Sequence, residues 1–425
     1  MSGAARSATR RAFWNLSASE ARAHARIAAV VLWVTAMVIV IGGTTYRDPF
    51  DQLKWTDFVH FYTLGHIARN GPVSDLYNPQ TQSEHQVALV PASAPEHYLP
   101  VYPPQVAIVF APLGNLPYHL AAVLWALVSL VVYSGAVYLA WRPMRHVLAP
   151  YALVGIAAAA FPPFWNLILH GQTTAIPIVA FTAAAIALVH DRKLLAGLAF
   201  GLLFIKPQFG LPLAVVVLTC GEWWILAGLA LSAGIQVLAV AGLLGPAALV
   251  DYANVLPRMA AVQNALEPSV AHLHSLAVLT RLLPGYVAPL VWLVASGAIC
   301  WMTVRVWRSP LPVSVRMGTL VIGSTLVNPH LNVYDAAVIA APLVSLSGWL
   351  ETQGGRAFDL RRRWYPAIYA LFVLLFFPTA RFMVVQLSPL VLLVLMHTAW
   401  RMADHSSLDE NVEASVGVAT VHTTT

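Results

Sequence analysis

Apolar runs long enough to cross a membrane recur along almost the whole of this 425-residue chain, and they restrict its fold more than any other feature. A hydrocarbon layer about 30 Å thick requires about 20 apolar residues per helix, and shorter helices suffice where protein covers their ends. Apolar residues make up 59% of the chain and charged residues only 10%, so the chain cannot cover itself with a water-soluble surface. The sequence therefore predicts an all-α polytopic membrane protein.

We predict about twelve membrane-spanning helices. They cover residues 27–43, 118–140, 150–165, 172–190, 194–206, 208–219, 223–244, 286–305, 312–327, 333–350, 364–378 and 382–400. The stretch 104–116 is short and bracketed by prolines, which favours a re-entrant or interfacial segment over a span. Residues 27–42 are apolar enough for a signal-peptide core but lack a small-x-small cleavage site, which favours an uncleaved anchor.

The distribution of charge predicts how the chain is oriented. Cytoplasmic loops collect Lys and Arg, and an arrangement of twelve spans with the amino terminus inside places most of the 24 Lys and Arg residues on the cytoplasmic side. The net charge of +6 is spread thinly, without a basic tract interleaved with aromatics, which excludes nucleic acid as a partner. The two cysteines lie inside apolar runs, so neither a disulfide framework nor a thiolate metal site is expected.

Three regions follow from this reading of the chain. Residues 1–26 form a basic cytoplasmic amino terminus, 27–400 form the transmembrane domain, and 401–425 form a polar cytoplasmic tail that we expect to be disordered. The transmembrane domain contains two long outer loops, 44–103 and 245–285.

The first outer loop contains an apolar stripe at helical spacing. Its members are Trp55, Phe58, Val59 and Tyr62. Such a stripe predicts a helix that lies in the headgroup region, with Asp57 and His60 on its opposite face, away from lipid.

Under this orientation, the polar residues at the ends of the spans collect on the outer side. They are Asp57, His60, Tyr102, His170, Gln172, Lys206, His272, His274, Asn328, His330 and Arg381. Apart from Lys206 and Arg381, their positions were not used to choose the orientation, so their convergence predicts one outward-facing polar cavity.

Simpler interpretations exist for each of these residues. Asp57 is also explained as a solvated loop acid or as a charge in the first turn of a helix. Lys206 is also explained as a lysine that snorkels to the interface, and the histidines as ordinary loop or capping residues. Two histidines and an acid at a spacing such as H-E-x-x-H are absent from the sequence, so we expect no metal.

Six short motifs, in order, give the chain a resemblance to a known family. They are Trp55-x-Asp57-Phe58, Leu76-Tyr77, Tyr102-Pro103-Pro104, Gly171-Gln172, Gly201-x-x-x-x-Lys206-Pro207 and Asn328-Pro329-His330. Between about residues 50 and 390 the chain resembles glycosyltransferase family 87, a branch of the GT-C polytopic glycosyltransferases. Members include a phosphatidylinositol-mannoside mannosyltransferase and a branching arabinofuranosyltransferase.

The resemblance implies an enzyme of the plasma or inner membrane with its active site on the outer face. Such an enzyme transfers a hexose, mannose first, or a pentose from a polyprenyl-phosphate donor to a hydroxyl of a lipid-linked or cell-envelope glycan, without a cofactor. The acid of the first outer loop is the catalytic base in such enzymes, which corresponds to Asp57, and a single displacement inverts the anomeric centre. A second acid that many GT-C enzymes carry near the first is absent here, which argues against metal dependence.

The remaining candidates divide between the donor phosphate and the sugars. Lys206, Arg381 and His330 are the expected phosphate-binding residues. The expected substrate-binding residues are His60, Tyr102, His170, Gln172, His272, His274 and Asn328. Asp51 and Asp335 have no particular claim to a role as a second carboxylate.

Two other classes of protein remain open. A secondary transporter of a polar or anionic solute also has about a dozen spans and broken helices, although its ionisable groups usually lie near the middle of the membrane. An O-antigen-ligase-like enzyme with a pyrophosphate-linked donor would need more cations on the outer face than this chain offers.

Overall fold

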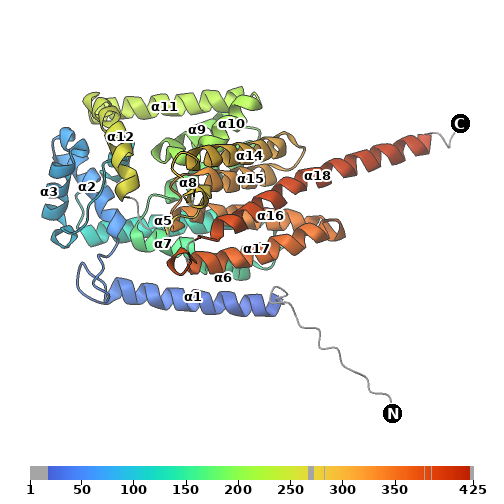
Figure 1. Cartoon of the computed structure of the whole chain (residues 1–425), viewed down its shortest axis with the longest axis horizontal. Coiled ribbons are helices and arrows are strands. Elements are labelled where there is room, and N and C mark those ends of the chain that lie inside the picture. The colour runs from blue at the N-terminus through green and yellow to red at the C-terminus, as the bar shows by residue number, and fades with distance from the viewer. Residues whose placement is uncertain (1–17, 267–271, 282, 378, 384, 422–425) are drawn as a thin grey trace, which may run out of the picture.

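The computed structural model describes residues 18–266, 272–281, 283–377, 379–383 and 385–421 (Figure 1). Within these ranges the chain is helical, and extended pairing is limited to two isolated bridges, Arg47 with Leu53 and Leu273 with Asn332. The all-α architecture expected from the apolar runs is confirmed.

The α-helices are α1 (Ala18–Ile41), α2 (Thr56–Asn70), α3 (Pro79–Leu89), α4 (Gln105–Phe110), α5 (Tyr118–Trp141), α6 (Tyr151–Ala159), α7 (Pro162–His170), α8 (Ala175–Val189), α9 (Lys193–Phe200), α10 (Leu211–Thr219), α11 (Trp223–Leu243), α12 (Ala247–Leu266), α13 (Leu276–Thr280), α14 (Ala288–Arg308), α15 (Val313–Val327), α16 (Ala340–Thr352), α17 (Phe358–Phe376) and α18 (Ser388–Val421). The 3-10 helices are η1 (Val73–Tyr77), η2 (Pro91–Ser93), η3 (Arg142–Met144), η4 (Gly201–Ile205), η5 (Pro207–Phe209), η7 (Val333–Ile339), η8 (Gly354–Ala357) and η9 (Thr379–Arg381).

Five helical segments of the described chain are long and apolar enough to cross a membrane. They are Arg22–Ile41, Tyr118–Met144, Trp223–Leu243, Ala288–Arg308 and Val333–Thr352. A sixth span results if α6 and α7, which meet at a bend of 59°, count as one. The chain is therefore a polytopic membrane protein, but the predicted number of twelve spans is not confirmed.

The difference in number has a physical cause, because prolines and glycines divide the apolar sequence into short helices. The predicted spans 172–190, 194–206 and 312–327 correspond to apolar helices of 10–17 residues. Such helices cross a bilayer only where neighbouring protein covers their ends. Residues 104–116 contain the six-residue helix α4, which is too short to cross.

The long helices α1, α11 and α17 run along the horizontal axis of Figure 1, and α2, α3 and α12 gather at its left end. Helix α18 extends beyond the body of the protein at the opposite end. We expected a disordered tail from residue 401, whereas the structure continues α18 to Val421.

Helix α2 forms between α1 and α5, as the apolar stripe predicts, but its surroundings differ from those expected. Instead of lying with one face in lipid, it is buried nearly all round, and Phe58, Val59 and Phe61 are at most 1% exposed. Helix α4 covers one side so closely that a Cβ atom on Gly65 would lie 2.3 Å from the carbonyl oxygen of Phe110. Phe58, Val59 and Phe61 belong to an apolar core around α2 that is smaller than the main core of the protein.

Candidate active site

The first turn of α2 presents Asp57 from a constrained backbone. Trp55 precedes the helix with a φ of 53°, which a bulky residue adopts only when its surroundings impose it. The hydroxyl of Tyr118 donates to the carbonyls of Lys54 at 2.8 Å and of Trp55 at 3.0 Å. The Asp57 side chain is partly exposed at the positive end of the helix, where a carboxylate is stabilised.

Gln172 reaches Asp57 from the turn that ends α7. The turn requires glycine at 171, because the residue has a φ of +67° and a Cβ atom there would lie 2.5 Å from Cβ of Phe58. Beyond this turn, Nε2 of Gln172 donates to Oδ2 of Asp57 at 2.7 Å. Gln172 is only 4% exposed, so its amide holds the carboxylate from the protein side.

Lys206 lies between η4 and η5, where Pro207 interrupts the helix, and it is not open to solvent. Its Nζ forms an ion pair with Oδ1 of Asp335 at 2.6 Å, and both side chains are at most 3% exposed. Oδ1 of Asp335 also accepts a hydrogen bond from the hydroxyl of Thr174 at 2.6 Å. We expected Lys206 to meet a donor phosphate directly, but its charge is balanced by Asp335 within the protein.

The ion pair is connected to Asp57 through Gln172. Nζ of Lys206 donates to Oε1 of Gln172 at 3.4 Å, and the backbone N–H of Thr173 donates to the same oxygen at 3.2 Å. Because two donors occupy the carbonyl oxygen of this amide, its NH₂ group must face Asp57. Asp335 pairs with Lys206, and Lys206 donates to the carbonyl oxygen of Gln172. The Asp57 carboxylate therefore receives a hydrogen bond from the NH₂ group of Gln172.

Three aromatic side chains line the site beside Asp57. His60 is stacked on Tyr98, with ring centroids 5.2 Å apart, and lies 5.7 Å from Tyr102. Burial lowers the pKa of His60 to about 3, so its ring is neutral. Burial, and then the carboxylates of Asp335 and Asp57, raise the pKa of Tyr102, so its hydroxyl remains protonated and able to donate a hydrogen bond.

A second group of side chains comes from loops far apart in the sequence. Arg381 in η9 and His272 are exposed, and His170 at the end of α7 is half-buried. Burial lowers the pKa of His272, and the positive charges of Arg381 and His170 lower it further, which shows that the three lie within electrostatic reach. The ring of His170 also lies 6.1 Å from that of Tyr334, next to Asp335 in η7. We call His170, His272 and Arg381 the cationic rim.

His274 and the loop after α15 form the support of this rim. Nδ1 of His274 lies 2.7 Å from the hydroxyl of Ser388, and its backbone N–H donates to the carbonyl of Leu331 at 2.9 Å. Burial, and then the charge of His272, lower the pKa of His274 to about 3. Asn328 is fully buried, and its Oδ1 accepts the backbone N–H of His330 at 2.9 Å.

The structure thus brings Asp57, His60, Tyr102, Gln172 and Lys206 into one group. It places His170, His272 and Arg381 in the cationic rim and uses His274, Asn328 and His330 in the loops behind it. The described residues contain no group of three or more His, Cys, Asp or Glu side chains that could hold a metal ion.

Sequence reasoning missed three contributors to the site. Asp335 was given no role, although a lone acid at the start of an apolar span is itself a signal of function. Thr174 and Tyr98 carried no signal, because a hydroxyl in a turn and a tyrosine in a long loop are common. The hydroxyl of Tyr98 donates to the carbonyl of Thr56, beside Asp57.

Comparison with known proteins gives one match. The family model of glycosyltransferase family 87 matches residues 101–329. No curated protein and no solved structure matches the chain. The matched segment covers more than half of the chain and includes Tyr102, Gln172, Lys206 and Asn328, whereas Asp57 and Asp335 lie outside it.

Proposed function

Because the chain belongs to glycosyltransferase family 87 and is therefore a membrane glycosyltransferase, we propose that it transfers a sugar from a polyprenyl-phosphate donor to a hydroxyl of a lipid-linked or cell-envelope glycan. One observation carries this proposal: the partly exposed carboxylate of Asp57 is held by Gln172 in a site whose rim includes the exposed guanidinium of Arg381. Membership of this family favours an enzyme over a transporter.

The proposed reaction is a single displacement. The acceptor hydroxyl gives its proton to the Asp57 carboxylate while its oxygen attacks the anomeric carbon of the donor sugar. The bond between that carbon and the phosphate oxygen breaks, the electron pair leaves with polyprenyl phosphate, and the anomeric centre inverts.

A double displacement needs a second carboxylate that reaches the sugar. Asp335 is the nearest candidate along this network, but it is buried and its charge is balanced by Lys206. Its pairing therefore supports inversion rather than retention.

The cationic rim supports a revised proposal for the donor phosphate. Arg381 and His272 are exposed and Lys206 is not, so we assign the phosphate to Arg381, with His272 and His170 beside it. Lys206 instead orients Gln172 and acts as a positioning residue. His330, a further expected phosphate ligand, lies on the loop behind the rim, where burial and then the charge of Arg281 lower its pKa.

The aromatic side chains beside Asp57 support a sugar-binding role. The phenol of Tyr102 offers a hydrogen-bond donor to a sugar, and the buried ring of His60 packs against it from the protein side. We propose a hexose donor, with mannose first and a pentose as the next choice. The site is proposed to face the outer side of the plasma or inner membrane, where nucleotide sugars are absent and a lipid-borne donor is required.

The test is a screen of the purified protein, in lipid nanodiscs, with synthetic polyprenyl-phosphate hexoses and pentoses and lipid-linked glycan acceptors. The expected result is a glycosylated acceptor of inverted anomeric configuration with at least one lipid donor, and none with nucleotide sugars. Transfer from a nucleotide sugar, or a retained configuration, would contradict the proposal.

A further inference from the structure

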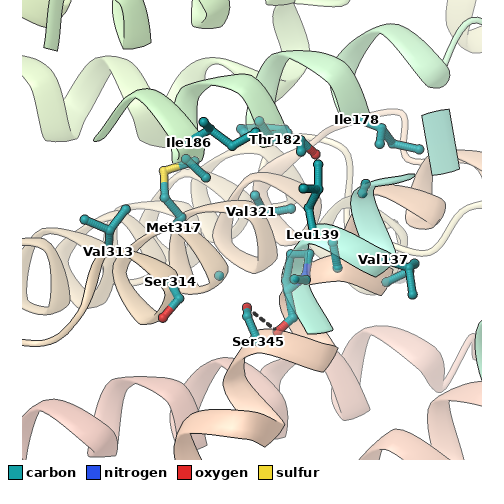
Figure 2. A pocket seen from close by; sticks show the side chains of 18 of the residues that line it. Val137, Leu139, Ile178, Thr182, Ile186, Val313, Ser314, Met317, Val321 and Ser345 are labelled. Carbon is teal, nitrogen blue, oxygen red and sulfur yellow. Dashed lines mark hydrogen bonds between the residues drawn. The ribbon is translucent and has the colours of Figure 1, made fainter. Parts of the chain in front are cut away.

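A cavity of about 620 Å³ is lined in part by Ala337 and Val338 of η7. It is formed by α5, α8, α15 and α16, and Figure 2 shows side chains of these helices pointing into it. Ligand pockets in proteins commonly measure roughly 300–1,000 Å³, so this volume is large enough for part of a lipid or another small molecule.

The lining of the cavity is suited to hydrocarbon. It includes Val137, Leu139, Ile178, Ile186, Val313, Met317 and Val321. Two of its polar groups are already satisfied, since the hydroxyls of Ser345 and Tyr133 donate to the carbonyls of Pro342 and Ala158. The mostly apolar lining offers few of the polar partners that an ordered water needs.

Some of the apolar residues that line the cavity are exposed on the surface of α5 and α8. Leu139 on α5 and Ile186 and Val189 on α8 line it and are 40%, 43% and 64% exposed. These helices are apolar, so side chains exposed on their surface face lipid tails in a membrane. A hydrocarbon chain can therefore enter the cavity from the bilayer without crossing water.

The mouth of the cavity carries positive charge. Arg142, at the end of α5, lines this end and is exposed, and His190 follows the last turn of α8. An arginine at the membrane surface attracts anionic headgroups. The apolar interior can accommodate the tail of a lipid, and Arg142 at the entrance can bind its phosphate.

We propose that this cavity binds an acyl chain of an anionic glycerophospholipid from the surrounding bilayer, with the lipid phosphate at Arg142. The bound chain packs against Ala337 and Val338 of η7, the same short helix that carries Asp335. It thereby supports the backbone that holds the Asp335–Lys206 pair. This inference depends on the membrane fold and not on the sugar or the donor of the reaction.

Photolabelling of the full-length protein in nanodiscs tests the proposal. The probe is phosphatidylglycerol with a photoreactive group in its acyl chain, and labelled peptides are mapped by mass spectrometry. The expected result is labelling of the cavity-facing residues of α8 and α15, such as Ala185 and Met317. Labelling confined to outward-facing residues such as Leu231 and Ile235 of α11, which are 48% and 54% exposed, would overturn it.

Two pairs of variants sharpen the test. Ala185→Phe fills the cavity and should abolish labelling of α15, whereas Ala183→Phe, on the same helix but outside the lining, should leave it unchanged. Arg142→Gln should reduce labelling about fivefold, and Arg145→Gln, an exposed arginine outside the lining, should not. Equal labelling in Ala185→Phe and Ala183→Phe, or equal labelling by phosphatidylglycerol and by phosphatidylcholine with the same chains, would contradict the proposal. If Ala185→Phe does not fold, the comparison of Arg142→Gln with Arg145→Gln still tests the proposal.

Discussion

Gln172 donates a hydrogen bond of 2.7 Å from Nε2 to Oδ2 of Asp57, although 115 positions separate the two residues in the chain. The carbonyl oxygen of the same amide faces Lys206, which is paired with Asp335. A buried ion pair therefore determines which end of an amide the proposed catalytic base contacts.

Gln172→Glu tests this arrangement, because it replaces a donor by a second carboxylate next to Asp57. Like charges at this distance raise the pKa of one of the two acids. We expect the acidic limb of the pH–rate profile to move to higher pH, with activity partly recovered in alkaline buffer. Gln172→Leu removes the donor without adding charge and should lower kcat with a smaller change in the profile. Identical profiles for wild type and Gln172→Glu would show that Gln172 does not hold the base.

The Lys206–Asp335 pair predicts a non-additive effect on stability. Asp335→Asn leaves a buried ammonium without its counter-charge and should lower the free energy of unfolding by about 3–5 kcal/mol. The double variant Lys206→Met with Asp335→Leu should lose much less stability, because no isolated charge remains. Thermal unfolding of the single variants Lys206→Met and Asp335→Leu and of the double variant in the same detergent measures this. Additive losses would contradict the pairing.

The architecture and most of the site were accessible from sequence. The apolar runs predict the helical membrane fold, and the family resemblance drawn from six short motifs is confirmed by the match over residues 101–329. Each site residue was expected at the end of a span or in a long loop on the same side of the membrane, and groups on one side of a helical bundle lie near one another. For that reason Asp57, Gln172 and Lys206 could be named before their contacts were known.

The pairing within the site could not be predicted. Lys206 and Asp335 are 129 positions apart, and nothing in hydropathy or charge distribution distinguishes a paired lysine from one that snorkels to the interface. The burial of α2 was missed for a related reason: an apolar stripe predicts what a helix prefers to contact, but whether lipid or α4 provides that contact depends on tertiary packing. The predicted number of twelve spans is not confirmed, because hydropathy does not show where prolines and glycines divide an apolar run into helices too short to be counted as spans.

The cationic rim predicts how donor binding depends on charge and pH. Arg381→Gln should raise the KM for the lipid-phosphate donor about tenfold with little change in kcat, whereas Arg69→Gln, an exposed arginine at the end of α2, should change neither. Arg381 lowers the pKa of His272, and a bound phosphate opposes that effect, so donor binding takes up a proton. We therefore expect the donor KM to fall as pH decreases from about 8 to about 6. If the donor KM changed neither with pH nor in Arg381→Gln, the cationic rim would have no role in binding the donor phosphate.

The buried histidines predict sensitivity to acid. Burial lowers the pKa of His60 from its ordinary value of 6.5 to about 3. Below pH 6.5 the unfolded chain takes up a proton that the folded protein does not, so stability that is present above this pH is lost as pH falls towards 3. His60→Phe should reduce the decrease in Tm between about pH 7.5 and about pH 5, and His97→Phe, at an exposed position, should not. Equal decreases in both variants would argue against a buried, neutral His60.

The most direct measurement compares sugar transfer by Asp57→Asn and by Asp51→Asn, using the lipid-phosphate donor found in the screen. Asparagine keeps the shape of the side chain and accepts no proton, so Asp57→Asn should lower kcat by about 10²–10⁴-fold while Tm and donor binding stay close to wild type. Asp51→Asn alters an exposed acid of the same loop and should retain full activity. Wild-type turnover by a correctly folded Asp57→Asn protein would contradict the assignment of Asp57 as the base.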